Sequence, residues 1–552
     1  MDRKEIFTER TFCIFISMGI LLNACCFFSQ VLEPDGALYA SIAKHMANTN
    51  DWVNLWGNGA DWLDKPHLPF WLTAASFKLF GISAFTYKLP SFLCWLAGIW
   101  YTYKLAEKVY STAIAQLAAI IYVTALHVIL SNADVRAEGY LTTFIVAATY
   151  YMYLAYINNK ISDIVLAALF SAFAIMTKGI FTIVTISSGF VIYWIINKEW
   201  KEFIKPKWYL LIVLIFIFIL PELYCLYTQF DLHPEKIVFG KTHVSGIHFF
   251  FWDSQFGRFM NNGPIKGSGD IFFFLHTTLW AFLPWSIILL IVLIGSFRKT
   301  AIAANKHALI IGGSAFITFL MFSLSKFQLP HYIVIIFPHL AMITSYWLME
   351  KAPDSTLKKL SNTQTTLFTI LSVLVVVIVY LTGFCSVWIP IAISLTITFT
   401  LFLKTCHPLL SIVKKNIGFA ILLALFLNGM FYHRLLTYQG GMMAGKWMNE
   451  AHPGKTVTMY QCNQYSFEFY CKGNVERADT STTLFKEDKD TIYVFTPARI
   501  VNRLQQNAPD KNIAVLNSFS NFHVSQVTGT FLNKTTRQEV LDTLVIAMIT
   551  NK

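Results

Sequence analysis

The chain has 552 residues, of which 55% are hydrophobic, 16% aromatic and only 13% charged, and its mean hydropathy is +0.52. A soluble protein of this length needs more charge to cover its surface, so the composition excludes an ordinary soluble protein. The net charge of +12 does not indicate nucleic-acid binding, because the basic residues lie between apolar stretches instead of forming one patch with aromatic residues.

Apolar stretches of membrane-spanning length recur from residue 11 to about residue 433, which predicts an all-α polytopic membrane protein. We expect about thirteen transmembrane helices of roughly twenty residues each. Their expected centres lie near residues 20, 95, 120, 147, 168, 188, 217, 283, 315, 340, 374, 395 and 425. The least distinct boundaries are Thr177-Lys178-Gly179, between the fifth and sixth spans, and the turn near Cys385.

Basic residues orient these predicted spans. Lysines or arginines follow every even-numbered span, for example Lys104, Lys160 and Lys198. The positive-inside rule therefore places the N-terminus in the cytoplasm, and an odd number of spans places the C-terminus on the opposite, outer side. The first apolar stretch is as long as a span, which favours an anchor over a cleavable signal peptide.

The first outer loop, residues 30–86, places polar residues close to the expected level of the lipid headgroups. Pro34 suits the start of a helix, and Asp35 brings a carboxylate to that end, where backbone N–H groups lack partners. Asp35 is either a capping acid or a functional group, and the sequence leaves both interpretations open. The residues that follow predict the apolar face of a helix on the membrane surface: Ala37, Leu38, Ala40, Ile42, Ala43 and Met46.

Ionisable residues gather on the same outer side. They occur in the loop 30–86, the turn Ser131–Glu138, the loop 228–270 and the turn Ser325–His331, and Lys178 lies at this level too. Charges at membrane depth are costly, so a converging set predicts a functional site, whereas any single lysine could simply extend to the interface.

Residues 438–552 have a different composition, which separates them from a membrane domain over residues 1–437. Short apolar runs at Thr456–Tyr460, Thr491–Phe495 and Ile513–Leu516 predict strands, and Ala498–Gln506 and Gln538–Ile549 predict helices. We therefore expect a small α/β domain on the outer side of the membrane. Its two cysteines, Cys462 and Cys471, could form a disulfide because an outer compartment permits one, and the sequence leaves open whether they are bridged or free.

Four motifs resemble those of the polyprenyl-phosphate-dependent glycosyltransferases of the GT-C class, which include protein O-mannosyltransferases and bacterial lipid A aminoarabinose transferase. The motifs are Glu33-Pro-Asp35-Gly-Ala-Leu-Tyr39-Ala with Asp64-Lys65-Pro66-His67-Leu68-Pro-Phe-Trp71, then Thr177-Lys178-Gly179, Ser325-Lys326-Phe-Gln-Leu329-Pro330-His-Tyr332 with Pro338, and Tyr465-Ser466-Phe-Glu-Phe469-Tyr470. The resemblance runs from about residue 5 to residue 475. His67 departs from it, because the family usually has a proline there.

The resemblance implies an enzyme of the bacterial inner membrane that moves a sugar from a polyprenyl phosphate to a glycolipid or protein acceptor at the periplasmic face, with inversion at the anomeric carbon. It also implies that the C-terminal α/β domain is periplasmic. It implies catalytic roles for Asp35 and Lys65, with Asp35 as general base if the acceptor is a hydroxyl, or as an orienting group if it is a phosphate. Lys65 would stabilise the departing phosphate. Either Asp134 or Glu138 matches the second carboxylate of the family. The remaining expected substrate-binding residues are Glu33, Tyr39, Arg136, Lys178, Arg258, Lys326, His331 and Tyr332.

No cofactor is expected, and no cysteine or histidine cluster has metal-ligand spacing, although the sequence does not exclude a divalent ion. The partners that we expect are the lipid-linked donor, the acceptor and membrane lipid, with the chain as a monomer and without nucleic acid. The competing function is a transporter or flippase for lipid-linked sugars. The absence of two matching halves in the sequence and the position of the charges at one face count against it.

Overall fold

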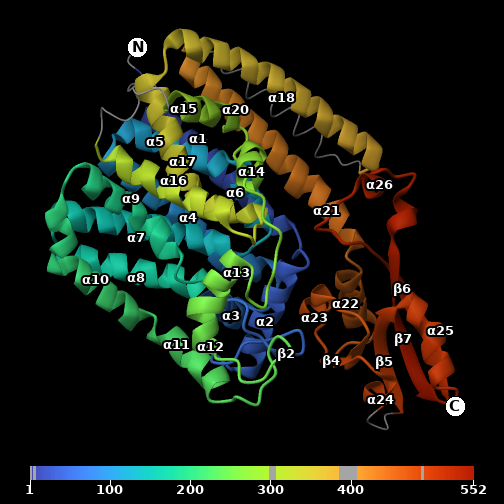
Figure 1. The fold of residues 1–552 in the computed structure, drawn as a ribbon. Helices are drawn as coiled ribbons and strands as arrows, with labels where there is room; N and C mark the ends of the chain where they lie inside the picture. Colours follow the sequence, from blue (N-terminus) through green and yellow to red (C-terminus); the bar gives the residue numbers. More distant parts are fainter. Residues whose placement is uncertain (1–2, 4–7, 297–305, 385–406, 486–489) are drawn as a thin grey trace.

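The computed structural model describes residues 3, 8–296, 306–384, 407–485 and 490–552. Helices form one large bundle, and the C-terminal strands form a sheet beside one end of it (Figure 1). The helices of the first half are α1 Glu9–Ala24, α2 Asp35–Thr49, α3 Leu68–Phe80, α4 Ala84–Val109, α5 Thr112–Thr124, α6 Leu126–Ala133, α7 Ala137–Asn158, α8 Ile161–Lys178, α9 Thr182–Ile196, α10 Pro206–Phe218, α11 Leu220–Leu226, α12 Gly246–His248, α13 Arg258–Met260 and α14 Phe273–Ala281.

The later helices continue the bundle and then enter the C-terminal segment. They are α15 Ser286–Ser296, α16 Ala308–Leu324, α17 Phe337–Tyr346, α18 Asp354–Thr382, α20 Pro408–Ala424, α21 Tyr432–Leu435, α22 Gly440–Ala451, α23 Tyr465–Tyr470, α24 Ser481–Leu484, α25 Ala498–Asn507 and α26 Gly529–Leu532. The strands are β1 Trp56–Gly57, β2 Ala60–Asp61, β3 Val457–Tyr460, β4 Val475–Ala478, β5 Thr491–Pro497, β6 Lys511–Asn521 and β7 Asp542–Asn551.

Among the described residues, seven helical segments are long and apolar enough to cross a membrane, or eight if the bent pair α5–α6 is one span. The seven are Glu9–Phe28, Ala137–Asn158, Ile161–Lys178, Pro206–Asp231, Pro330–Lys351, Asp354–Thr382 and Pro408–Tyr438. The bend of 54° between α5 and α6 arises where the Leu126 N–H donates to the Leu283 carbonyl oxygen, 2.7 Å away, instead of continuing the helix. The predicted helical, multi-pass class is confirmed.

The predicted number of spans is not confirmed. The helices at the sixth and ninth predicted spans, α9 and α16, are shorter than eighteen residues. The eighth is divided between α14 and α15 around Pro284, and the second, α4, carries charged residues at both ends. The predicted twelfth span and the turn near Cys385 lie outside the described residues.

The C-terminal sheet has the order β4-β3-β5-β7-β6, in which β3 runs parallel to β4 and β5, while β7 runs antiparallel to β5 and β6. The three predicted strands lie in β3, β5 and β6, and the helix predicted at Ala498–Gln506 is α25. Cys462 and Cys471 are both free thiols.

The helix predicted at Gln538–Ile549 is wrong, because most of this stretch belongs to strand β7. Strand β7 is buried on both faces over its middle residues, so its apolar residues form a continuous run without the alternation that identifies a half-exposed strand. Leu544, Val545, Ile546 and Ala547 are all buried. Their β-branched members favour the extended conformation that β7 adopts.

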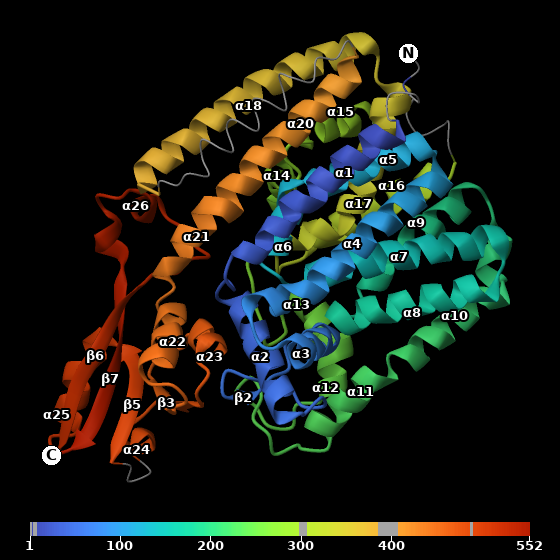
Figure 2. The same ribbon diagram turned by 180° about the vertical axis from the view of Figure 1, so that it is seen from behind.

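Helix α2 begins at Asp35, directly after Pro34, as the sequence predicts. Its apolar face does not lie on the membrane surface, which corrects that expectation. Ala37, Ala40, Ile42 and Met46 are buried, and α2 contacts α3 and α23 (Figure 2). The predicted amphipathic pattern is therefore that of a helix buried between two parts of the protein.

Candidate functional site

A cavity of about 450 Å³ opens between the first outer loop and the bundle, and three cations line it. Lys65 comes from the loop between β2 and α3, Lys178 ends α8, and Arg258 begins α13. The rest of the wall is mainly apolar and aromatic: Leu63, Pro66, Ile180, Phe181, Val184, Leu226, Phe249, Phe250, Phe256, Phe259, Met260, Met321, Phe322, Phe327 and Tyr332. An apolar wall with a few charged groups suits a lipid chain that carries an anionic head.

Asp64 joins two of these cations. Its carboxylate contacts the Lys65 ammonium with one oxygen and the Arg258 guanidinium with the other. Burial acts to raise the pKa of Asp64, but the charges of Lys65 and Arg258 outweigh it and lower the pKa to about 2. Burial also lowers the pKa of Lys65, and the charge of Asp64 opposes that shift. Asp64 is therefore a fixed anion that holds Lys65 and Arg258 beside the cavity.

Asp35 lies in a second charged group, built around Arg136. The Arg136 guanidinium donates from Nη1 to Asp35 Oδ2 at 2.6 Å and from Nε to Asp134 Oδ2 at 2.8 Å. Arg136 precedes α7, so its side chain links the start of that helix to the start of α2. The Asp35 side chain is 37% exposed, the most accessible of these three groups. Its carboxylate is accessible to a substrate while Arg136 keeps it in place.

Glu138, Lys178 and His331 form a third group of ionisable side chains, next to Arg136. Glu138 and Lys178 are an ion pair with side chains only 3% and 8% exposed. His331 Nε2 lies 3.8 Å from the Glu138 carboxylate, and its Nδ1 lies 3.4 Å from Arg136 Nη1. The Lys178 ammonium also stands 3.5 Å from the centre of the Tyr332 ring, a cation–π contact.

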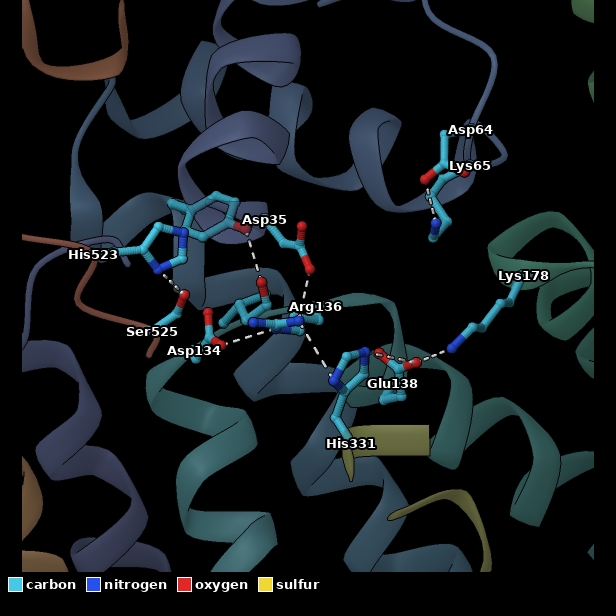
Figure 3. Close-up of polar contacts among 12 residues, drawn as sticks. Asp35, Asp64, Lys65, Asp134, Arg136, Glu138, Lys178, His331, His523 and Ser525 are labelled. Carbon is cyan, nitrogen blue, oxygen red and sulfur yellow. Dashed lines mark hydrogen bonds and ion pairs between the residues drawn. The ribbon is translucent and has the colours of Figure 1, made fainter. Parts of the chain in front are cut away.

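Asp35 and Lys65 face the same space without contacting each other (Figure 3). Asp35 is paired with Arg136 and Lys65 with Asp64, yet the Asp35 charge still acts on Lys65. Tyr39 is close enough to both groups to interact with their charges: burial and then the charges of Asp35 and Asp64 raise the pKa of its hydroxyl well above the usual value. The structure thus brings together most of the residues predicted from the sequence.

Two predicted residues lie elsewhere. The Lys326 side chain is exposed and is not part of the cavity wall. Glu33 does not line the cavity, and its carboxylate accepts a hydrogen bond from the Ser466 N–H at 2.6 Å. Its position one residue before Pro34 gave no sign of this orientation.

Sequence analysis missed three residues that fix the site. Asp64 is part of the motif quoted above, but its position next to Lys65 in the sequence did not indicate a role of its own. Glu222 is fully buried, and its carboxylate accepts from the His67 N–H at 2.9 Å and lies 3.0 Å from His67 Nδ1, which holds the loop next to Lys65. A glutamate within an apolar span was the available signal for Glu222.

Gln255 is the third missed residue, and it braces the turn after Lys178. Its side-chain amide donates to the Lys178 carbonyl oxygen at 3.3 Å and accepts from the Phe181 N–H at 3.4 Å. Gly179 in this turn has φ = +113°, a conformation that favours glycine, and a Cβ there would overlap the Gln255 amide. The turn therefore fixes where α8 presents Lys178.

No group of three or more His, Cys, Asp or Glu side chains in the described part of the chain could hold a metal ion. A second, more polar cavity of about 790 Å³ lies between α2 and the C-terminal strands and includes Lys44, Trp56 and Arg477. None of the site residues predicted from the sequence lines it, so the candidate site is the cationic cavity with the adjoining Asp35 group.

Comparison with known proteins identifies similar chains. A family model described as dolichyl-phosphate-mannose-protein mannosyltransferase matches residues 64–225. An undecaprenyl phosphate-alpha-4-amino-4-deoxy-L-arabinose arabinosyl transferase of Enterobacter is 23% identical over 64% of this chain and 62% of that protein, and one of Shewanella sediminis is 22% identical over 69% and 67%. An uncharacterized protein of Aquifex aeolicus is 25% identical over 61% and 62%. The chain thus spans about three-fifths of the length of the first of these relatives.

Solved structures show the fold more completely. ArnT from Cupriavidus metallidurans bound to undecaprenyl phosphate has a TM-score of 0.74 at 17% identity, covering 97% of both chains. The Archaeoglobus fulgidus oligosaccharyltransferase has a TM-score of 0.50 at 10% identity, covering 90% of this chain and 70% of that one. Together with the family match, these comparisons confirm the resemblance predicted from the four motifs.

Proposed function

We propose that this chain, which has the fold of ArnT and resembles the polyprenyl-phosphate-dependent glycosyltransferases, is an inverting glycosyltransferase of the bacterial inner membrane. Its donor is a sugar linked to undecaprenyl phosphate, for which the names of the relatives suggest 4-amino-4-deoxy-L-arabinose. Its acceptor is a glycolipid of the lipid A type or a protein at the periplasmic face. The proposed reaction needs no nucleotide, because the sugar–phosphate bond of the donor supplies the energy.

The single observation that carries the proposal is the apolar cavity that ends in Lys65, Lys178 and Arg258 beside the accessible Asp35. The aromatic wall accepts the polyprenyl chain, and the cations lie where negative charge grows on the departing phosphate. A preorganised donor of this kind contributes roughly 3 kcal/mol to the transition state. The carboxylate of Asp64 keeps two of the three cations in place before the substrate arrives.

Asp35 acts on the side of the sugar opposite the departing phosphate. An acceptor oxygen attacks the anomeric carbon with its electron pair, the bond from that carbon to the phosphate oxygen breaks, and the bonding pair leaves with the phosphate. If the acceptor is a hydroxyl, its proton passes to the Asp35 carboxylate, a contribution of about 10²–10⁴-fold. If the acceptor is a phosphate, no proton is removed, and Asp35 with Arg136 orients the acceptor.

The test is sugar transfer by the purified protein in detergent, with undecaprenyl phosphate-linked aminoarabinose and lipid A as substrates. We expect modified lipid A by mass spectrometry and one undecaprenyl phosphate released per sugar transferred. A flippase needs a sealed bilayer and would form no product under these conditions. Intact donor after incubation with every acceptor tried, protein acceptors included, would contradict the proposal.

A further inference from the structure

The residues that lead into Asp35 are held by the C-terminal segment. Gln30–Pro34, which we call the lead-in segment, connects the helical turn Cys25–Phe28 to α2 without regular structure. Because Asp35 is the first residue of α2, the backbone of the lead-in segment determines where its carboxylate lies. The hydrogen-bond partners of that backbone are therefore of functional interest.

Gln439 makes the most complete of these contacts. Its side-chain amide donates to the Val31 carbonyl oxygen at 3.0 Å and accepts from the Glu33 N–H at 3.0 Å. The residue is fully buried, just before α22. A side-chain amide that satisfies both a carbonyl and an N–H of the same extended segment fixes that segment in position and direction.

Two residues of helix α23 supply three further hydrogen bonds. The Tyr470 hydroxyl accepts from the Val31 N–H at 2.8 Å and donates to Gln30 Oε1 at 2.9 Å. The Ser466 N–H donates to the Glu33 carboxylate at 2.6 Å. Figure 2 shows α23 beside α2, and α23 and the adjoining α22 both belong to the C-terminal segment.

The apolar contacts agree with the polar ones. Leu32, in the middle of the lead-in segment, is buried in a cluster whose other members include Leu436, Met442, Val524 and Phe531. On the other side, the buried Lys88 ammonium of α4 donates to the Cys26 and Ser29 carbonyl oxygens, each at 2.9 Å. The residues just before the lead-in segment are thus held by the bundle, and the lead-in segment itself is held by the C-terminal segment.

We propose that Gln439 and Tyr470 are positioning residues for Asp35, so that the C-terminal segment is part of the transfer machinery. The role rests on the proposed function. Other contacts between α2 and the C-terminal segment, such as Ser41 Oγ to the Tyr465 carbonyl oxygen at 3.1 Å, lie farther along the helix and do not touch the lead-in segment. They fasten the two parts together, whereas Gln439 and Tyr470 act on the residues that carry Asp35.

The experiment compares Gln439→Leu and Tyr470→Phe with the matched control Ser41→Ala. Gln439→Leu keeps the approximate volume and removes both hydrogen bonds, and Tyr470→Phe keeps the ring. A displacement of about 1 Å at a reacting group can cost about 10²-fold, so we expect kcat to fall by about 10–100-fold in the first two variants. Ser41→Ala removes one bond between the same two parts, and we expect its kcat to stay within about twofold of the unsubstituted value.

A second measurement separates positioning from general loosening of the structure. Binding of undecaprenyl phosphate depends on the cavity cations and not on Asp35, so its Kd should be unchanged in Gln439→Leu and Tyr470→Phe. Weaker binding in parallel with the lost kcat, or an equal loss in Ser41→Ala, would overturn the positioning role. So would a normal kcat in Tyr470→Phe, the variant chosen in case Gln439→Leu does not fold. Absence of transfer by the unsubstituted protein would instead contradict the proposed function.

Discussion

At the residue scale, the cavity cations are arranged before any substrate binds. Lys65 and Arg258 share Asp64, and Lys178 is paired with Glu138, so each cation is compensated by an anion in its low-polarity surroundings. A phosphate that enters the cavity adds a further anion to groups whose positions are already fixed. This arrangement reduces the reorganisation required in the transition state.

The first prediction concerns Lys65. Removing one preorganised donor typically lowers kcat by about 10²–10³-fold, so Lys65→Ala should lose this much transfer in detergent while remaining folded. Lys266→Ala is the matched control, because Lys266 is an exposed lysine of the outer loop 228–270 that does not line the cavity. Equal activities of the two variants would remove Lys65 from the chemistry.

The second prediction concerns Glu33, whose burial raises the pKa of its carboxyl group from the usual 4.5 to about 7, against the hydrogen bond from Ser466. Between these two values the folded protein holds a proton that the unfolded chain releases. Stability conferred through Glu33 is therefore lost as the pH rises from about 4.5 to 7, and it is constant above pH 7.

Glu33→Gln keeps an oxygen that accepts from Ser466 and removes the titration. Across pH 5 to 8 in detergent, the Tm of the unsubstituted protein should fall relative to that of Glu33→Gln. Glu450→Gln, at an exposed carboxylate of α22, should follow the unsubstituted profile. A constant Tm difference between Glu33→Gln and the unsubstituted protein across this range would show that Glu33 is not the responsible group.

Several site residues could be predicted from the sequence because the chain has few charged residues, and a charge at membrane depth is costly unless it has a function. Asp35, Lys65, Arg136 and Lys178 were identified in this way, with motifs that resemble a known family. Asp64 and Gln255 could not be, since their roles depend on contacts with Arg258 and Gly179 that are distant in sequence. Lys326 was assigned from a motif, but that motif does not determine which way its side chain points.

At the scale of single elements, the end of α8 carries the clearest local constraint. Gly179 has φ = +113° and no room for a Cβ beside Gln255. Gly179→Ala should therefore displace Lys178, lower Tm by a few degrees and weaken transfer. Gly312→Ala on α16 is the matched control, because a Cβ there meets nothing within 4 Å, and its Tm should be unchanged or higher. A Gly179→Ala protein as stable and active as Gly312→Ala would contradict this account of the turn.

Element boundaries were less predictable than element positions. The stretches near residues 20, 147, 168, 217, 340, 374 and 425 do contain span-length helices. A long apolar run that crosses a membrane must satisfy its backbone hydrogen bonds within itself, and a helix does so. Hydropathy does not reveal the break at Ala125, after which the Leu126 N–H donates to the distant Leu283 carbonyl oxygen. Nor does it reveal that the apolar run of β7 is a strand with a neighbour on each side. Both depend on partners far along the chain.

At the scale of the whole molecule, the site lies where the first outer loop, the bundle and the C-terminal segment meet (Figures 2 and 3). The loop provides Asp35 and Lys65, the bundle provides Arg136, Glu138 and Lys178, and the C-terminal segment supports the lead-in to Asp35. Such an arrangement requires that all three parts reach the same side of the membrane.

The predicted topology places that side outside the cytoplasm, in the periplasm. Alkaline phosphatase fused after Lys552 should be active, because it folds only outside the cytoplasm, and a green fluorescent protein fused before Met1 should fluoresce. These outcomes are expected because basic residues gather in the loops that the positive-inside rule assigns to the cytoplasm. A fluorescent C-terminal fusion together with an inactive phosphatase fusion would reverse the orientation and place the candidate site on the cytoplasmic side.

The central claim is that the Asp35 carboxylate takes part in the transfer of a sugar from a polyprenyl phosphate to its acceptor. The most direct test is the rate of undecaprenyl phosphate release by purified Asp35→Asn in detergent, measured beside the unsubstituted protein at the same Tm and with saturating donor. The account predicts repeated turnover by the unsubstituted protein and a rate at least about 10²-fold lower in the variant. Turnover by Asp35→Asn at the unsubstituted rate would contradict it.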